Sequence, residues 1–158
     1  MLKLLKDKGF DLDETLLLSE FALYQVEQEL GQRYPQVHLV RLVGDVKDLD
    51  GLRAMFKAHA PDIVFHAAAY KHVPLMEDNP SIAVLNNVGG TRNLAELAVA
   101  NNVEKFVMVS TDKAVNPTNV MGASKRAAEL FVQSLQNVEA KSTKFITTRF
   151  GNVLGSNG

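Results

Sequence analysis

Short apolar runs rich in β-branched residues alternate along this chain with longer segments of helical periodicity. We interpret residues 15–19, 37–44, 62–69, 105–111 and 144–153 as strands, and residues 20–34, 48–59, 80–102 and 121–136 as helices. A strand, a helix and a second strand in series form a right-handed crossover and a parallel pair. Runs such as "FVMV" do not alternate with polar residues, which is typical of strands buried on both faces. The sequence therefore predicts an α/β fold with a doubly wound parallel sheet.

The first twenty residues lack the turn that opens a Rossmann-like dinucleotide-binding domain. Such domains begin with a strand and a glycine-rich turn, yet residues 1–20 contain no G-x-G-x-x-G motif. We interpret "LKLLKDKGFDLDE" as the tail of the first helix and the loop that follows it. In the strand order 3-2-1-4-5-6 the missing strand is the central one. We expect residues 1–158 to form one partial domain, so either another segment fills this gap or the chain is an incomplete piece of a larger protein.

Composition and charge exclude several classes of function. The formal net charge is −1 and acidic and basic residues are interspersed, so no basic stripe is available for nucleic acid. The chain has no cysteine for disulfides or thiolate zinc sites, and its four histidines form no metal-ligand pair on one helix face. No apolar run approaches the roughly 20 residues that span a bilayer, and "MLKLLKDKGF" lacks the features of a signal peptide. We expect a cytoplasmic chain that binds no nucleic acid, no metal and no membrane.

Chemically reactive residues gather where the predicted strands end. In open α/β sheets, ligands bind beyond the carboxyl ends of the strands. These ends are residues 19–20, 44–45, 66–70, 110–113 and 149–152. The stretch "STDKAVNPTNVMGASKR" brings to one of them a serine–threonine pair, an Asp–Lys pair, and a helical lysine that follows Met121 by four residues. The sequence therefore predicts a ligand site along that edge of the sheet.

Six stretches in order resemble those of a known family: "SEFALYQVEQEL", "GDVKD", "FHAAAYKHVPLMEDNP", "NNVGGTRNL", "STDKAVNPTNVMGASKR" and "RFGNVLGSNG". From about residue 19 onward, the chain resembles the extended short-chain dehydrogenase/reductases, specifically the nucleotide-sugar 4,6-dehydratases of polysaccharide biosynthesis. It looks most like the large, membrane-anchored members that act on UDP-N-acetylglucosamine, in which methionine commonly replaces a catalytic tyrosine. The resemblance implies NAD or NADP as cofactor, a UDP-sugar substrate and a homo-oligomer. It also implies a C-terminal substrate lobe, which this chain lacks, and an inner-membrane anchor in full-length relatives.

The reaction that this resemblance implies has three steps. A nicotinamide takes hydride from sugar C4, a base removes the C5 proton while an acid protonates the departing C6 hydroxyl, and hydride returns to C6. Asp112 and Lys113 match the family's acid and base, and Thr111 and Lys125 match the remaining members of its reductase triad. The acid must be protonated and the amine neutral, which requires burial or mutual coupling. Taken alone, an Asp–Lys pair of this kind is more often a solvated turn.

Met121 occupies the position of the tyrosine that handles the C4 proton in other relatives. A thioether sulfur is only a weak hydrogen-bond acceptor. We therefore interpret Met121 as a side chain that fills an irregular gap near the cofactor. The C4 proton would then pass to a water, to Lys125 or to Lys113, and our hypothesis is a relay through Thr111 and an ordered water.

The remaining site residues are carried over from the family. Asp45 resembles a residue that contacts the adenine amine, although a turn or helix cap explains it equally well. Asn87 resembles an asparagine that fixes the geometry of the active site, and Asn152 one that meets the substrate diphosphate. Ser19 and Glu20 fall where the adenosine ribose is bound, which leaves NAD and NADP both open. The predicted cofactor-binding residues are Ser19, Glu20, Asp45, Val46, Ala67, Ala68, Ala69, Lys71, Asn87 and Lys125, and the predicted substrate-binding residues are Lys71, His72 and Asn152.

Two other functions remain open at this level. A nucleotide-sugar 4-epimerase uses the same scaffold, but it needs no elimination acid and base and usually keeps the tyrosine. A non-catalytic remnant, in which the fold serves binding or assembly, is compatible with the missing glycine-rich turn. The "TDK" at residues 111–113 favours the 4,6-dehydratase over the epimerase.

Overall fold

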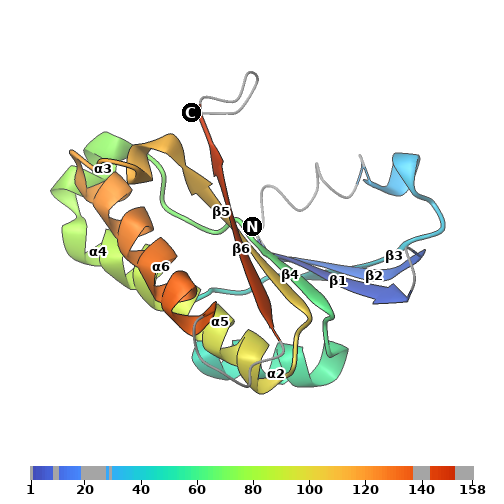
Figure 1. Cartoon of the computed structure of the whole chain (residues 1–158). Coiled ribbons are helices and arrows are strands. Elements are labelled where there is room, and N and C mark those ends of the chain that lie inside the picture. The colour runs from blue at the N-terminus through green and yellow to red at the C-terminus, as the bar shows by residue number, and fades with distance from the viewer. Residues whose placement is uncertain (1, 9–10, 19–27, 29, 137–142, 152–158) are drawn as a thin grey trace.

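A six-stranded sheet forms the centre of the fold. The computed structural model describes residues 2–8, 11–18, 28, 30–136 and 143–151. The sheet order is β3-β2-β1-β4-β5-β6 (Figure 1). The strands are β1 Leu2–Lys8, β2 Asp11–Leu18, β3 His38–Leu42, β4 Ile63–His66, β5 Lys105–Thr111 and β6 Lys144–Phe150. The pairs β2–β3, β4–β5 and β5–β6 are parallel, so the predicted α/β class with parallel strands and crossover helices is confirmed.

The N-terminal segment differs from the prediction. Residues 2–8 form β1 instead of the tail of a helix, and β1 pairs antiparallel with both β2 and β4. It fills the central position that we assigned to the missing strand, so the sheet is not wholly parallel. Only residues 9–10 separate β1 from β2, and so short a connection permits an antiparallel pair but not a parallel crossover. In this position β1 supplies hydrogen-bond partners to the backbones of both neighbouring strands.

Most helices agree with the predicted segments, with one interruption, but the short helix at Val73–Asp78 was not predicted. The helices are α2 Leu49–His59, α3 Val73–Asp78, α4 Pro80–Val84, α5 Gly90–Ala100 and α6 Val120–Gln136, and residues 30–33 of the predicted helix 20–34 are helical. The single helix predicted over residues 80–102 is divided by a π-helical turn, η1 Leu85–Gly89. Asp48, not Asp50, caps α2, since its carboxylate accepts a hydrogen bond from the N–H of Gly51 at 3.1 Å.

The core lies between the sheet and the helices α2, α5 and α6. Its fully buried side chains include Phe56 of α2, Leu94 of α5, and Val64 and Phe106 of the strands. Burial of a large apolar side chain contributes roughly 1.5–3 kcal/mol, so this layer fixes how the helices sit on the sheet. Along β5 buried and half-buried residues alternate, in contrast to the equal burial on both faces that the apolar run suggested. One face of β5 therefore packs against the helices more closely than the other.

Candidate active site

Three of the predicted catalytic residues come together where β5 ends. β5 ends at Thr111, and the chain turns into a short 3-10 helix, η2 Asp112–Ala114. The Thr111 hydroxyl lies 3.0 Å from the carboxylate of Asp112 and donates to it, and the backbone N–H of Lys113 donates to Thr111 Oγ1 at 3.4 Å. The Lys113 ammonium lies 3.5 Å from Asp112 Oδ1. The local turn thus gathers a hydroxyl, a carboxylate and an amine.

These groups are open to solvent. The side chain of Asp112 is 58% exposed and that of Lys113 is 41% exposed. The hydrogen bond from Thr111 lowers the pKa of the Asp112 carboxyl from its usual value, and the Lys113 ammonium lowers it further. Asp112 is therefore a carboxylate at neutral pH in this state, and an acid role for it requires that a proton be delivered.

Gly122 lets the first turn of α6 approach this cluster closely. A Cβ atom at Gly122 would overlap the backbone oxygen of Lys113. The N–H groups that begin α6 are satisfied by side chains, because Val120 donates to Glu77 Oε1 at 2.6 Å and Gly122 donates to Asn119 Oδ1 at 2.8 Å. The position of η2 is thus fixed against a capped helix N-terminus.

Met121 does not face a polar environment. Its side chain is 4% exposed and packs with the buried Met76 and Ala83, and with the partly buried Val73 and Val120. This apolar cluster joins α6 to α3 and α4. The packing supports the interpretation of Met121 as a space-filling residue, and it leaves the handling of a proton to neighbouring side chains.

Lys125 lies under the end of β5. It is 5% exposed, and its ammonium donates to the carbonyl oxygen of Val109 at 2.8 Å. Burial lowers the pKa of Lys125 to about 8, an effect that the negative charge of Glu129 partly offsets. A lysine ammonium has three donors, so Lys125 can also bind a hydroxyl of a ligand above the strand end.

Asn87 connects the loop after β4 to α6. Its side-chain oxygen accepts from the N–H of Tyr70 at 2.8 Å, and its amide nitrogen donates to the carbonyl of Tyr70 at 3.1 Å and to Ser124 Oγ at 2.9 Å. Asn87 lies in the π-helical turn η1, a feature that often marks functional sites. The clamp holds the loop that carries the predicted residues Ala67, Ala68, Ala69, Lys71 and His72, of which the three alanines are half-buried and the other two exposed.

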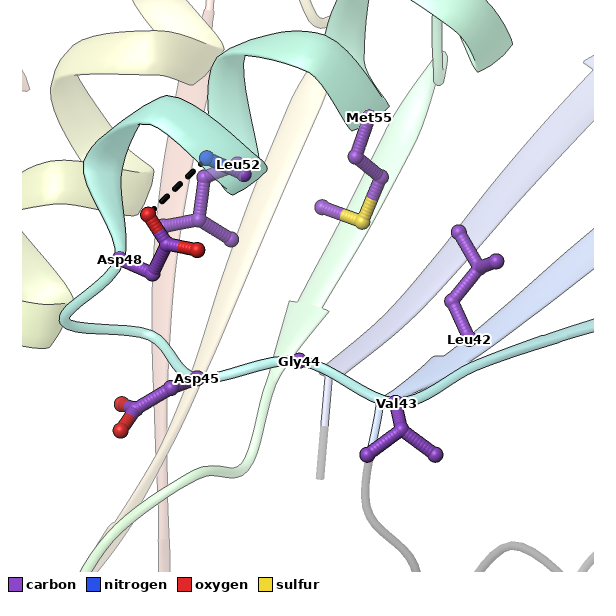
Figure 2. Close-up of a pocket in the computed structure, with 8 residues that line it drawn as sticks. Leu42, Val43, Gly44, Asp45, Asp48, Leu52 and Met55 are labelled. Carbon is purple, nitrogen blue, oxygen red and sulfur yellow. Dashed lines mark hydrogen bonds between the residues drawn. The ribbon is translucent and has the colours of Figure 1, made fainter.

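A second part of the predicted site lies at the end of β3. A pocket of about 150 Å³ is lined by Leu42, Asp45, Leu52 and Met55, among others, and Figure 2 shows it between α2 and the loop that follows β3. Asp45 forms a turn, accepting from the N–H of Lys47 at 2.9 Å and pairing with the Lys47 ammonium at 3.1 Å. The turn interpretation of Asp45 is thus observed, with one carboxylate oxygen bound by the Lys47 N–H and the other by the Lys47 ammonium, and the pocket lies beside this turn.

Helix α5 holds the neighbouring residue Val46 in place. Asn93 donates to the carbonyl of Val46 at 3.1 Å, and a Cβ atom at Gly90 would overlap the Val46 side chain. Gly90, the second glycine of "NVGGT", therefore permits a close approach between α5 and this loop. The predicted residues Ser19, Glu20 and Asn152 lie outside the described residues.

Sequence reasoning missed a buried ion cluster beside Lys125. Glu129 is fully buried and accepts from Arg149 at 2.9 and 2.7 Å and from Arg126 at 3.0 Å. Burial alone would raise the pKa of Glu129, but the hydrogen bonds from Arg149 and Arg126 and the charge of Arg149 together outweigh it and lower the pKa to about 2. The available signal was an acid four residues after Lys125, on the same face of a predicted helix.

His66 is a structural histidine. It is fully buried, its ring lies 5.9 Å from that of Phe106, and burial lowers its pKa well below the usual value. The Thr91 hydroxyl donates to the carbonyl of Asn87 at 2.6 Å, so toward His66 Nε2, 2.8 Å away, it acts as an acceptor. His66 is therefore neutral with its proton on Nε2. Among the described residues no group of three acidic or histidine side chains gathers as a metal site.

Comparisons with known proteins identify the family of this chain. A family model described as "Polysaccharide biosynthesis protein" matches residues 11–158. The chain is 49% identical over 152 residues to the capsular polysaccharide biosynthesis protein CapD of Staphylococcus aureus, covering 94% of this chain and 25% of that protein. It is 44% identical over 117 residues to a UDP-N-acetylglucosamine 4,6-dehydratase (inverting) of Campylobacter jejuni. That match covers 73% of this chain and 34% of the relative. A UDP-glucose 4-epimerase of Rickettsia canadensis is 36% identical over 149 residues. That match covers 94% of this chain and 42% of the relative.

Solved structures also match this chain. The X-ray structure of Pen from Bacillus thuringiensis matches with a TM-score of 0.79 and 36% identity, covering 90% of this chain and 43% of that one. MoeE5, in complex with UDP-glucose and NAD, matches with a TM-score of 0.73, covering 87% of this chain and 54% of that one. Because the identity is only 22%, this match supports the fold alone. The chain spans a quarter to two fifths of the length of these curated relatives. No described helix is both long and apolar enough to cross a membrane. The chain belongs to the polysaccharide biosynthesis protein family, with the fold of the nucleotide-sugar short-chain dehydrogenase/reductases.

Proposed function

We propose that this chain is the cofactor-binding portion of a nucleotide-sugar 4,6-dehydratase that converts UDP-N-acetylglucosamine to its 4-keto-6-deoxy product in polysaccharide biosynthesis. The observation that carries the proposal is the cluster of Thr111, Asp112 and Lys113 at the end of β5, with Lys125 buried beside it. Elimination of water across C5 and C6 needs an acid and a base that reach adjacent carbons. Asp112 and Lys113 lie close enough to do so.

The described residues fit a nicotinamide dinucleotide, either NAD or NADP. Lys125 has donors available for ribose hydroxyls, the small residues Ala67, Ala68 and Ala69 allow close approach of a ligand to the backbone after β4, and the pocket beside Asp45 suits an adenine ring. When bound, the nicotinamide would accept hydride from C4 of the sugar and return it to C6. Lys71 and His72 lie on the exposed loop after β4, where they can reach a sugar nucleotide.

The protein groups divide the remaining work. Lys113, as a neutral amine, removes the C5 proton, and Asp112 protonates the departing C6 hydroxyl. A sugar that covers the cluster would exclude water from it. Exclusion of water disfavours charged groups, so it favours the neutral amine that elimination requires and makes the Asp112 carboxylate a better proton acceptor.

The test combines binding with isotope exchange. The purified chain is titrated by calorimetry with NAD and with NADP, and then incubated with UDP-N-acetylglucosamine in deuterated water. We expect cofactor binding, and deuterium at C5 that Lys113→Ala abolishes. The absence of both would refute the proposal.

A 4-epimerase is the second candidate, because a UDP-glucose 4-epimerase matches 94% of this chain. Two features favour the dehydratase: Asp112 and Lys113 form an acid–base pair, and Met121 occupies the position where an epimerase keeps a tyrosine. Inversion at C4 without incorporation of deuterium at C5 would support the epimerase instead.

A further inference from the structure

The Thr111 hydroxyl directs its proton at Asp112. The distance from Thr111 Oγ1 to Asp112 Oδ1 is 3.0 Å, and the same hydroxyl oxygen accepts the N–H of Lys113 at 3.4 Å. A hydroxyl has one proton to donate and two lone pairs that accept. With one lone pair engaged by Lys113, the other can accept a proton from the hydroxyl of a bound sugar.

The cluster also needs a source for the proton that leaves with C6. Asp112 is 58% exposed, hydrogen-bonded by Thr111, and 3.5 Å from the Lys113 ammonium, and each of these favours the carboxylate. A carboxylate cannot protonate a leaving hydroxyl. The proton must therefore reach Asp112 during the reaction, and the hydrogen bond from Thr111 offers a route to it.

We propose that Thr111 is a catalytic residue that passes the proton of the C4 hydroxyl to Asp112, and that Asp112 delivers this proton to the departing C6 hydroxyl. The inference deepens the proposed dehydratase function and rests on it. Met121 takes no part, since its side chain lies in the apolar cluster with Met76 and Ala83. The Thr111–Asp112 pair thus does the work of the absent phenol.

The atoms and electrons balance. The cycle starts with Asp112 as a carboxylate and Lys113 as a neutral amine, whose ammonium proton has been released to solvent. A bound oxidised nicotinamide would accept hydride from C4, while the C4 hydroxyl proton moves to Thr111 Oγ1 and the proton of Thr111 moves to Asp112, leaving a ketone. The Lys113 amine takes the C5 proton, the C6–O bond breaks, and the proton of Asp112 leaves with the hydroxyl as water. The cofactor would return the hydride to C6, and Lys113 returns a proton to C5, so Thr111, Asp112 and Lys113 end as they began.

The rate of C4 oxidation in a single turnover distinguishes two roles for Asp112. In one it accepts the C4 proton through Thr111, and in the other it serves only as the acid for the leaving C6 hydroxyl. The reaction uses UDP-N-acetylglucosamine and NAD, and the absorbance of the reduced cofactor reports C4 oxidation. In the relay Asp112→Asn slows oxidation by about 100-fold or more, because the C4 proton has no acceptor. A simple elimination acid would leave oxidation intact and the reduced cofactor would accumulate. Lys113→Met is the matched control, since it blocks only removal of the C5 proton and accumulates the reduced cofactor.

Threonine variants complete the kinetic test. We expect Thr111→Val to slow C4 oxidation by about 10²–10⁴-fold and Thr111→Ser to restore it to within several-fold of the unsubstituted chain. Equal oxidation rates in Asp112→Asn and Lys113→Met, or wild-type oxidation in Thr111→Val, overturn the relay while leaving the dehydratase proposal standing. No oxidation by the unsubstituted chain overturns the proposed function, and the relay with it.

A second measurement needs no turnover. Titration of the Asp112 carboxyl by ¹³C NMR should show a higher pKa in Thr111→Val than in the unsubstituted chain, because the hydrogen bond from Thr111 is the main cause of the lowered value. Thr111→Ser should keep the lower pKa. An unchanged pKa in Thr111→Val, in a protein with an unchanged melting temperature, overturns the hydrogen bond on which the relay depends.

Discussion

Two charged clusters lie at the end of β5, and they differ in solvent exposure. The exposed cluster consists of Thr111, Asp112 and Lys113, with side chains of Asp112 and Lys113 that are 58% and 41% exposed. The buried cluster consists of Lys125, Glu129, Arg126 and Arg149, in which Glu129 is fully buried. The first is held by one turn of backbone, and the second joins helix α6 to strand β6.

The same kind of group behaves differently in the two clusters. The pKa of Asp112 is lowered by the hydrogen bond from Thr111 in open solvent, whereas the low pKa of Glu129 persists against burial because Arg149 compensates its charge. The low pKa of Lys125 comes from burial itself. The exposed cluster can therefore change its protonation when a ligand covers it, while Glu129 and its two arginines keep their charges and hold α6 against the end of β6.

The largest expected effect comes from breaking the buried cluster. Glu129→Ala leaves two guanidinium groups without their carboxylate, and we expect the free energy of unfolding to fall by about 3–4 kcal/mol. The lower part of the range for buried pairs applies because both arginines are partly exposed. Chemical denaturation with urea measures the change.

Asp112→Asn is the control for this experiment, since it removes a carboxylate from the exposed cluster. We expect no resolvable change in its denaturation midpoint. If Asp112→Asn lowered the free energy of unfolding as much as Glu129→Ala does, the division into an exposed and a buried cluster would be contradicted.

Helix α6 and strand β5 are the parts that the sequence predicted best, because α6 has a helical apolar periodicity and β5 is a short apolar run rich in β-branched residues. The gathering of residues 111–113 at a strand end also followed from topology. The Glu129–Arg149 pair did not, because β6 and α6 meet only in the folded chain and the sequence does not show which arginine reaches the acid. The prediction of a helix tail over residues 2–8 was wrong, because "LKLLKDK" has no decisive period.

A smaller and pH-dependent effect is expected at Lys125. Its pKa is about 8 in the folded chain and 10.5 in the unfolded one, so between these values the unfolded chain binds more protons. Stability should rise with pH through that window, by up to about 1.4 kcal/mol per pH unit, and be lost again as the pH falls to 8. Denaturation of the chain and of Lys125→Met at several pH values gives the difference. If the two proteins show parallel pH dependences, Lys125 is not desolvated as the structure shows it.

The smallest expected effect is at Gly122, where α6 touches the exposed cluster. Gly122→Ala places a Cβ atom against the backbone oxygen of Lys113, so η2 must shift, and we expect a loss of about 1–2 kcal/mol in thermal denaturation. Gly89→Ala is the matched control, because a Cβ atom there meets nothing within 4 Å and alanine favours a helical conformation. It should leave stability unchanged or raise it by up to about 1 kcal/mol.

The same substitution also tests how the two clusters are connected. A shift of η2 moves Asp112 and Lys113 without touching Glu129 or Arg149, which lie farther along α6 and on β6. The Asp112 pKa, read by ¹³C NMR, should therefore change in Gly122→Ala while the pKa of Lys125 stays at about 8. A change in the pKa values of both Asp112 and Lys125 would mean that the buried cluster moves together with η2. The exposed groups would then not be positioned independently of helix α6.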